Sequence, residues 1–513
     1  MKKLTTLLLI ALLAFSTFAA CGSINTKPTD DTKSEDDVPA HEDSIVIAIE
    51  SEPTTLNPYD HAAVVSGYMN QLTYNRLFKI DVDTLKPVPD LVESFENTDE
   101  NTWVFTIKQG VMFHDGTEMT AEDVKASMEY ARDFTSSNKY TGFWTNIEVT
   151  DKYTVKITTN GPYALILNDL SANGNTIVPK ALIDSGNDFN KNPIGSGPYK
   201  FVQWTLGDNL TFVKNENYFD KEHTPTITDM TWRVIPEGSS RTIALENGEV
   251  DLIIDVASTD VSRILDTEGL KLDEVDGTRM NFMALNNEKD IFSNVLVRKA
   301  INSLIDKAAV VEVAANGQGK PAIGMNPSAY AGTTDDGADE YNVQKAMEYF
   351  KQAGVDPTTL SFTCMCYTDA TRRSAEVIQG CLAEAGITMN IETLDFAAFL
   401  SKLLEGNYEA AIAGYSSSDL LTYMKGLWHS SSINATNSSR MSDSEIDSLI
   451  TLASSQLDDT ERTATMTSVA KLTNENTPFI PLFTSSVIRA YNESLNGVKV
   501  GASGLMYFCD LSW

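Results

Sequence analysis

The chain has 513 residues, of which 71 are acidic and 39 basic, so its formal net charge is −32. This charge excludes nucleic-acid binding as the main role, because a phosphate backbone is recognised by a basic surface. After the N-terminal segments, a body of roughly 470 residues is larger than one hydrophobic core supports, which predicts two or three lobes.

The N-terminus has the features of a secretory signal. Lys2 and Lys3 precede an apolar run from Leu7 to Ala20 that is too short to span a bilayer. The run ends in Phe18-Ala19-Ala20-Cys21, which resembles a bacterial lipobox with Phe in place of the usual Leu. This predicts cleavage before Cys21 and lipidation of its thiol; an ordinary secretory signal that happens to end near a cysteine is the alternative.

The segment from Gly22 to Asp43 is rich in Ser, Thr, Asp, Glu and Pro and has almost nothing apolar to bury. Such a composition cannot offset the entropy lost on ordering, so we expect a flexible linker. No later stretch is apolar for long enough to cross a membrane, and we therefore expect contact with the membrane through the lipid anchor only.

Four further cysteines follow: Cys364, Cys366, Cys381 and Cys509. A disulfide among them stays open, but small buried thiols are favoured, because a chain of this size needs no disulfide scaffold. A metal site is not predicted, since Cys-x-Cys lacks the usual zinc-ligand spacing and no histidine lies near it in the sequence.

The first half of the body carries strand and turn signals. The segment from Ser44 to Asp60 begins with a β-branched run and continues into a Pro-containing turn, which predicts a strand that ends there. Trp103, Phe105 and Ile107 alternate as in a half-buried strand, and Asp115-Gly116 predicts a tight turn. Thr120, with Asp123 three residues later, predicts the start of a helix.

Helical patterns dominate the second half. Asn342 to Ala353 places its apolar residues on one stripe, and Gly354 suits a left-handed C-cap. Arg372 to Gly386 repeats this pattern, and a strand from Thr388 to Leu394 follows. Helices with strands returning between them predict α/β lobes with open mixed sheets, in which ligands bind at the carboxyl ends of the strands.

Enzyme motifs are absent from the sequence. It contains no G-x-S-x-G, H-E-x-x-H, G-x-x-x-x-G-K-[ST] or G-x-G-x-x-G pattern, and its five histidines are scattered singly. Carboxylates are so numerous that a chance pair carries no information about catalysis. We therefore expect neither a catalytic site nor a cofactor; a secreted hydrolase or adhesion protein of unrelated fold is the alternative.

Several segments occur in an order that is typical of one family. They are Pro87 to Val124, Gly195 to Tyr199, Asn215 to Phe219, Arg233 to Asp251, Phe292 to Asp306, Tyr341 to Gly354 and Phe479 to Leu482. Together they resemble the extracellular solute-binding proteins of family 5, which serve oligopeptide, dipeptide and nickel importers. Each segment alone is a weak signal, because most are structural turns and caps.

The resemblance implies an α/β fold of the periplasmic-binding-protein type II kind, with two lobes of mixed sheets plus an inserted third domain. It divides the chain into a signal peptide (1–20), a lipidated cysteine with a linker (21–43), domain I (44–78, 190–285 and 480–513), domain II (79–189) and domain III (286–479). The ligand is expected between the lobes.

The same resemblance implies the binding subunit of an ABC importer at the extracytoplasmic face of the cell membrane. We expect a monomer that captures a short peptide by hinge closure and delivers it to a membrane permease. A nickel chelate, haem or an oligosaccharide is the alternative solute for this fold.

A short peptide calls for an acid near its α-ammonium group and an Arg near its α-carboxylate. In the segment Gly414-Tyr415-Ser416-Ser417-Ser418-Asp419 the family's acid stands one residue late, so Asp419 either binds the amine or caps the following helix. Arg372 and Arg373 resemble an Arg pair at a helix start in dipeptide receptors, one of which meets the ligand; solvated surface arginines are the alternative.

Two aromatic residues are further candidates for ligand contact. Tyr415 and Trp428 have side chains that can stack on a bound solute. Burial in the core of the lobe is the alternative for both.

Overall fold

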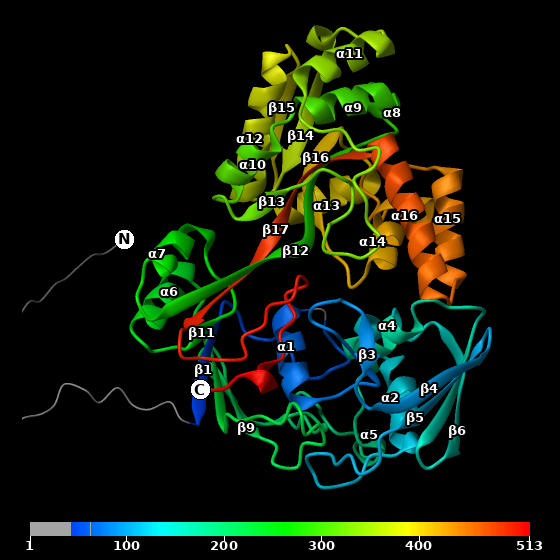
Figure 1. Ribbon diagram of the computed structural model, residues 1–513, viewed down its shortest axis with the longest axis vertical. Coiled ribbons are helices and arrows are strands. Elements are labelled where there is room, and N and C mark those ends of the chain that lie inside the picture. The colour runs from blue at the N-terminus through cyan, green and yellow to red at the C-terminus, as the bar shows by residue number, and fades with distance from the viewer. Residues whose placement is uncertain (1–42, 62) are drawn as a thin grey trace, which may run out of the picture. The chain divides into compact units, whose positions relative to one another are not determined.

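The structure is a computed structural model that describes residues 43–61 and 63–513 (Figure 1). The predicted signal peptide, the lipidation site Cys21 and the linker up to residue 42 lie outside the described residues. Within residues 43–61 and 63–513, no helix is both long enough and apolar enough to cross a membrane.

One mixed sheet of 11 strands connects most of the fold. Its order is β15-β14-β16-β12-β17-β11-β1-β10-β9-β8, and β13 pairs with β17 off this path. The long strands β12 (Leu270–Leu285) and β17 (Phe479–Asn492) are antiparallel partners and are called the crossover strands below. Figure 1 shows them running from the part of the sheet that holds β11 to the part that holds β16.

The first lobe is built on β1, which lies between β10 and β11 and is parallel to both. Ile45, Ile47 and Ile49 of β1 enter one core with the fully buried Trp232. The elements of this lobe are β1 (Ser44–Ile49), α1 (Val64–Thr73), β8 (Tyr199–Thr205), β9 (Asn209–Lys214), β10 (Asp229–Val234), α6 (Gly238–Glu246), β11 (Leu252–Ile253) and α7 (Val261–Leu265).

The insert is a separate antiparallel sheet of order β4-β5-β7-β6 with its own core. Trp103, Phe105 and Ile107 point into this core, as their alternation predicts. Its elements are β2 (Phe78–Ile80), β3 (Pro87–Pro89), β4 (Val92–Asp99), β5 (Thr102–Ile107), α2 (Ala121–Ala131), α3 (Thr135–Asn138), β6 (Trp144–Asp151), β7 (Thr154–Thr159), α4 (Ile166–Ser171) and α5 (Lys180–Asp184).

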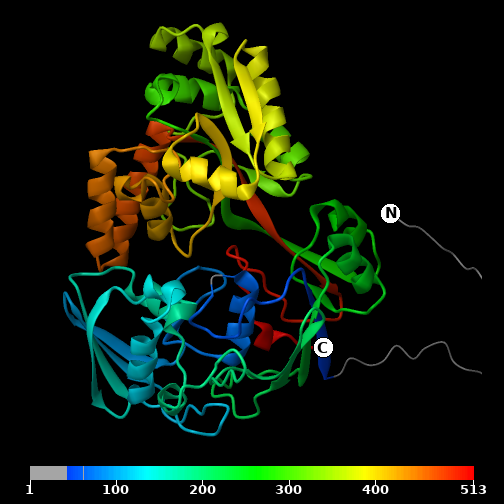
Figure 2. The ribbon, with the colours of Figure 1, turned by 180° about the vertical axis from the view of Figure 1, so that it is seen from behind.

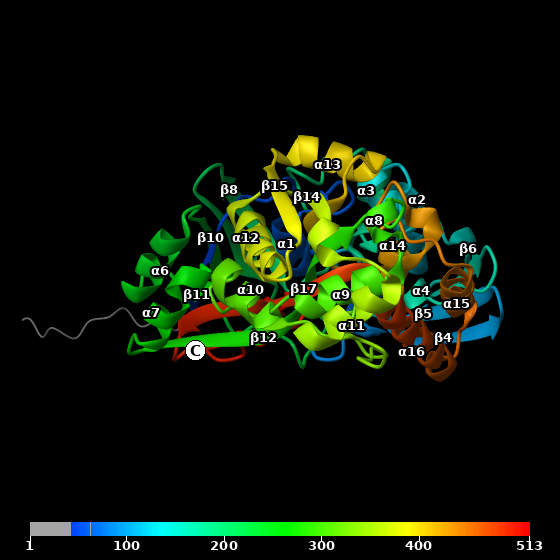
Figure 3. The same cartoon turned by 90° about the horizontal axis from the view of Figure 1, so that it is seen from above.

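The second lobe carries the parallel strands β14 and β15 and most of the helices. Seen from above, α10 and α12 lie side by side next to β14 and β15 (Figure 3), and α15 packs along α16 (Figure 2). The elements are α8 (Asp290–Ser293), α9 (Val295–Leu304), α10 (Lys307–Ala314), β13 (Gly319–Pro321), α11 (Val343–Ala353), β14 (Ser361–Cys366), α12 (Asp369–Glu384), β15 (Thr388–Thr393), α13 (Phe396–Glu405), β16 (Ala410–Tyr415), α14 (Leu420–Trp428), α15 (Ser444–Ser455) and α16 (Asp459–Asn476).

The crossover strands are irregular at one place. The register of β12 against β17 shifts between Asp276 and Met280 and again between Asn281 and Phe282. At Gly277 a Cβ atom would lie 2.3 Å from the carbonyl oxygen of Ser485, so the two backbones approach too closely for any side chain. Such bulges bend a strand and increase its twist.

Local predictions agree with the observed elements, with one shifted boundary. Thr120 and Asp123 form a capping box at the start of α2, and Gly354 ends α11 with a φ of 70°. The helix expected from Arg372 begins earlier, at Asp369, because Thr368 supplies the N-cap. The four cysteines in the described part of the chain are free thiols, and those of β14 are buried.

Candidate functional site

Three neighbouring cavities share lining residues. The central cavity, of ≈ 360 Å³, is lined by residues between His61 and Gly174, by residues 503–507 and by Ser418 of the loop after β16. The crossover cavity, of ≈ 480 Å³, lies beside β12 and β17 and shares Tyr68 with the central cavity. The lateral cavity, of ≈ 380 Å³, lies between the insert and the second lobe and shares Asn168 with the central cavity. The three therefore form one row.

Basic side chains line the central cavity. Arg76 donates a hydrogen bond to Oδ1 of Asn173, and its buried Nε has no partner among the described residues. Burial lowers the pKa of Arg76, but a guanidinium stays charged in a protein. Lys79 lies 3.9 Å from a carboxylate oxygen of Asp220, whereas the ammonium group of Lys139 lies over the ring of Tyr140 and has no carboxylate partner among the described residues. The cavity is thus suited to an anionic group.

One carboxyl group, that of Asp169 in the first turn of α4, also lines the central cavity. Its Oδ2 accepts a hydrogen bond of 2.7 Å from the hydroxyl of Tyr163. Burial raises the pKa of Asp169 to about 7, and the negative charge of Asp419 on the second lobe adds to the shift. A cation that entered the cavity beside Asp169 would stabilise its charged form.

A buried guanidinium lines the crossover cavity. Arg489 of β17 is 4% exposed and donates hydrogen bonds to the carbonyl oxygens of Ile254 (2.5 Å) and Gly504 (3.0 Å). It has no carboxylate partner within 4.0 Å among the described residues, and its Nε is unpaired there. A buried cation without a counter-ion is costly, and an incoming anion would lower that cost.

The end of β16 leaves backbone groups open. β16 pairs with β12 over its full length, whereas its ladder with β14 ends at Ala411. A Cβ atom at Gly414 would lie 2.7 Å from Nη2 of Arg279, so this side chain rests on the strand. Arg279 is exposed and forms no hydrogen bond or ion pair within the described part of the chain.

Asp419 is the N-cap of α14. Its Oδ1 accepts a hydrogen bond of 2.8 Å from the backbone N–H of Thr422, and its Oδ2 accepts one of 2.8 Å from the hydroxyl of Ser418. The capping role, one of the two alternatives from the sequence, is therefore observed. Asp419 also lines the lateral cavity, so its carboxylate caps the helix and borders a cavity at the same time.

The two aromatic candidates differ in accessibility. Tyr415 is half-buried beside the ring of Tyr423 and lines none of the three cavities. Trp428 is fully buried, where it donates a hydrogen bond of 3.1 Å to Oδ1 of Asn326 and packs against Phe479. Trp428 thus occupies the core, which was the alternative, and a solute cannot reach its ring in this structure.

The Arg pair lies at the start of α12 and lines none of the three cavities, although Ala370 of the same helix lines the crossover cavity. Arg372 is paired with Glu376 at 2.5 Å and with Asp369 at 3.4 Å. Arg373 donates hydrogen bonds of 3.1 Å to the carbonyl oxygens of Val313 and Ala314. The structure therefore does not bring the predicted residues together, since Asp419 alone lines one of the three cavities.

Comparison with known proteins identifies the kind of site. The sequence profile of the bacterial extracellular solute-binding proteins, family 5 (middle region), matches residues 86–435, which is more than half of the chain. The chain belongs to this family. It is accordingly a solute-binding protein and not an enzyme, as the sequence predicted.

Relatives of this family 5 protein match it over nearly all of its length. The glutathione-binding protein GsiB of Salmonella paratyphi A is 26% identical over 471 residues, which cover 88% of this chain and 91% of that protein. HbpA2 from Haemophilus parasuis has a TM-score of 0.84 at 24% identity, covering 91% of this chain and 99% of that one. DppA from Helicobacter pylori in complex with the peptide STSA has a TM-score of 0.75 at 25% identity, covering 92% and 98%.

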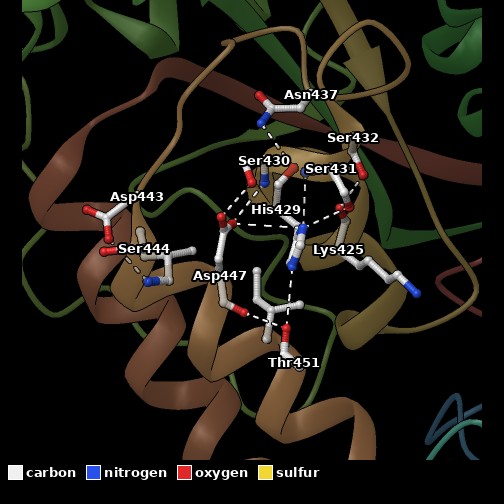
Figure 4. A network of polar contacts seen from close by, with 12 residues as sticks. Lys425, His429, Ser430, Ser431, Ser432, Asn437, Asp443, Ser444, Asp447 and Thr451 are labelled. Atoms are coloured by element: carbon white, nitrogen blue, oxygen red, sulfur yellow. Dashed lines mark hydrogen bonds and ion pairs between the residues drawn. The ribbon is translucent and has the colours of Figure 1, made fainter.

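A serine, a histidine and an aspartate do meet in the second lobe of this family 5 protein (Figure 4). The backbone N–H of Ser431 donates to Nδ1 of His429 at 3.1 Å, and Oδ1 of Asp447 lies 3.9 Å from the same nitrogen. A catalytic triad needs the acid and the nucleophile on opposite ring nitrogens. Here Asp447 instead accepts a hydrogen bond from the backbone N–H of Ser430, so the cluster fixes the turn after α14.

Three cavity residues escaped the sequence analysis: Arg76, Asp169 and Arg489. Each is a charged residue inside a short apolar stretch, as in the sequence Tyr-Asn-Arg-Leu-Phe around Arg76. Charged residues are seldom buried without a partner, so such positions are a usable signal. The sequence pattern does not tell whether such a charged residue is structural or contacts a ligand, because that depends on the cavity around it.

Proposed function

We propose that this protein captures short peptides between its lobes and delivers them to the membrane permease of an ABC importer. The observation that carries the proposal is the mixed charge of the central cavity, whose lining includes Arg76 and Lys139 as well as Asp169. A short peptide carries an ammonium and a carboxylate at its two ends, and it matches such a cavity without adding net charge. The name of GsiB, a glutathione-binding protein, and the peptide in the DppA complex are in keeping with this solute class.

The peptide backbone is proposed to lie along the open end of β16. Main-chain hydrogen bonds to a strand edge give affinity that is independent of side chains. The α-ammonium group is placed near Asp169 and Asp419, which come from the insert and the second lobe. A ligand held by both sides stabilises the closed arrangement of the lobes.

For the α-carboxylate we prefer Arg489 and Arg76 to the predicted pair Arg372 and Arg373. The first two have an unpaired Nε and line the crossover and central cavities. Both members of the predicted pair already have acceptors, which a ligand would have to displace. Tyr415 and Trp428 are proposed to support the site through packing.

Hinge closure is proposed to occur at the irregular part of the crossover strands, near Gly277. Taking the lobes from about 1:99 closed to about 99:1 requires roughly 5.5 kcal/mol of differential ligand affinity. Two charge-assisted contacts of about 1.5 to 3 kcal/mol each, together with main-chain hydrogen bonds, are sufficient. The hinge therefore needs no energy source other than the ligand.

The domain boundaries stay a proposal: domain I at 44–78, 190–285 and 480–513, domain II at 79–189 and domain III at 286–479. A monomer is proposed, anchored through a lipid on Cys21 at the extracytoplasmic face of the membrane. Mass spectrometry of the protein isolated from membranes tests the anchor. A diacylglyceryl mass on the N-terminal cysteine is expected, and its absence would contradict the anchor without affecting the solute class.

The solute class is tested with the freshly purified chain. Native mass spectrometry is expected to find co-purified peptides of a few residues, and a peptide library is expected to raise the melting temperature. Nickel chelates, haem and oligosaccharides serve as comparison ligands. Stabilisation by one of these, with silence across the peptides, would overturn the proposal.

A further inference from the structure

We infer that the lateral cavity is a subsite for a large apolar side chain on the first residue of the bound peptide. This inference rests on the proposed function and names a preference within it. The cavity has ≈ 380 Å³, within the range of small-ligand sites, and lies between the insert and the second lobe. Its walls are mainly apolar: Phe95, Trp103 and Leu165 come from the insert, and Leu421, Leu457 and Met466 from the second lobe.

Phe95 is the clearest sign that this surface has an occupant. Its side chain is 41% exposed although it stacks on Trp103, with ring centroids 6.4 Å apart. Most of the aromatic residues around it are buried in the core of the insert. An aromatic wall left open to a cavity offers area to an apolar group, and aromatic pairs are favourable beyond the area they bury.

The position of the lateral cavity indicates that the first side chain of the peptide is its occupant. Asn168 lines both the central and the lateral cavity, and the neighbours Ser418 and Asp419 line one each. A peptide ammonium held near Asp169 and Asp419 therefore places the first Cα at the opening between the two cavities. The first side chain then enters the lateral cavity, while the rest of the peptide remains in the central one.

The rim of the cavity disfavours a cationic occupant. Nζ of Lys86 lies 2.7 Å from Oδ2 of Asp459, and Nη2 of Arg462 lies 2.7 Å from Oδ1 of the same carboxylate. The carboxylate of Asp459 is thus already shared by two cations, so a cationic side chain would find no free counter-ion in this cluster. The ion pair of Lys86 and Asp459 also joins the two sides of the cavity, which makes the subsite complete only when the lobes meet.

The test compares tripeptides by isothermal titration with the full chain. Phe-Ala-Ala is expected to bind about 10- to 100-fold more tightly than Ala-Ala-Ala, whereas Ala-Ala-Phe is expected to stay within about threefold of it. Phe95→Ala should remove most of this preference. Phe396→Ala, which truncates an exposed Phe outside the three cavities, is the control and should leave the preference intact.

A second variant protects the test against misfolding of Phe95→Ala. Ala331 is exposed and lines the lateral cavity, so Ala331→Trp fills the cavity without disturbing the core. It is expected to abolish the preference for Phe-Ala-Ala and to leave Ala-Ala-Ala binding within about threefold. Equal binding of the three peptides, or a preference that survives Ala331→Trp, would overturn the subsite and spare the proposed function. If no peptide binds at all, both fail.

Discussion

Replacement of Asp169 by Asn tests the role of this carboxyl group in stability and in peptide binding, because both are expected to depend on pH. Burial raises the pKa of Asp169 from 3.8 to about 7, so the folded chain holds a proton that the unfolded chain releases. The stability that this group contributes is therefore fully present below about pH 4 and is lost as the pH rises through 7. A shift of roughly three units corresponds to about 4 kcal/mol at pH 8, as an upper value.

We expect Asp169→Asn to unfold at higher urea concentration than the wild type at pH 8, and the difference should be much smaller at pH 4.5. The amide oxygen of Asn can still accept the hydrogen bond from Tyr163, so no other contact is lost. Unfolding midpoints by circular dichroism, without ligand, measure the difference. Asp266→Asn, which removes an exposed carboxylate, is the control. A destabilised Asp169→Asn, or a gain independent of pH, would refute the electrostatic reasoning.

Peptide affinity should change with pH in the opposite direction. A ligand ammonium beside Asp169 favours its ionised form, so wild-type affinity is expected to rise between pH 5.5 and 7, by at most tenfold per pH unit. This range stays below the ordinary pKa of an α-amino group, about 7.7 to 8. An N-acetylated peptide should show no rise, nor should any peptide with Asp169→Asn; a rise that persists in the variant would remove Asp169 from the site.

Further substitutions test the other parts of the site and fold. Arg489→Met leaves the carbonyl oxygens of Ile254 and Gly504 without donors, so we expect the free energy of unfolding in urea to fall by about 2 to 4 kcal/mol. Peptide binding should weaken at least tenfold, and unchanged binding would exclude Arg489 as the carboxylate contact. Gly277→Val should lower the melting temperature steeply because of the 2.3 Å contact, whereas Gly380→Ala, in α12 with open space around it, should gain about 0.5 to 1 kcal/mol. Trp428→Ala should cost about 3 to 5 kcal/mol by calorimetry, and a cost below 1 would contradict its place in the core.

Elements with strong local signals could be predicted from the sequence. The capping box of Thr120 and Asp123, and the left-handed glycine after α11, depend on residues within a few positions of each other. Such patterns fix where an element begins or ends, whatever it packs against. The start of α12 was missed because Thr368 also forms a capping box, with a threonine in place of the usual acid.

The site could be predicted only in part, because its residues come from distant segments. Arg76 and Asp169 lie in the first half of the chain, whereas Arg489 follows them by hundreds of residues. Their meeting depends on the crossover strands, whose pairing no local pattern reveals. Asp419 was predicted because it lies close to the position of an acid in the family pattern. That pattern contains no position for Asp169, the second acid that we propose near the ligand ammonium group.

The net charge of the chain and the charge of the central cavity have opposite signs, and the difference bears on selectivity. A surface with a formal net charge of −32 repels anions at long range, although salt screens this beyond ~8 Å. Within the row of cavities the near fields of Arg76, Lys139 and Arg489 are stronger. A zwitterionic peptide has no net charge, so the acidic surface repels it little. Its ammonium and carboxylate groups can still both contact charged residues in the cavities. A polyanion meets the repulsion in full and finds only part of its charge paired, so uncharged and zwitterionic peptides should outcompete acidic ones of equal length.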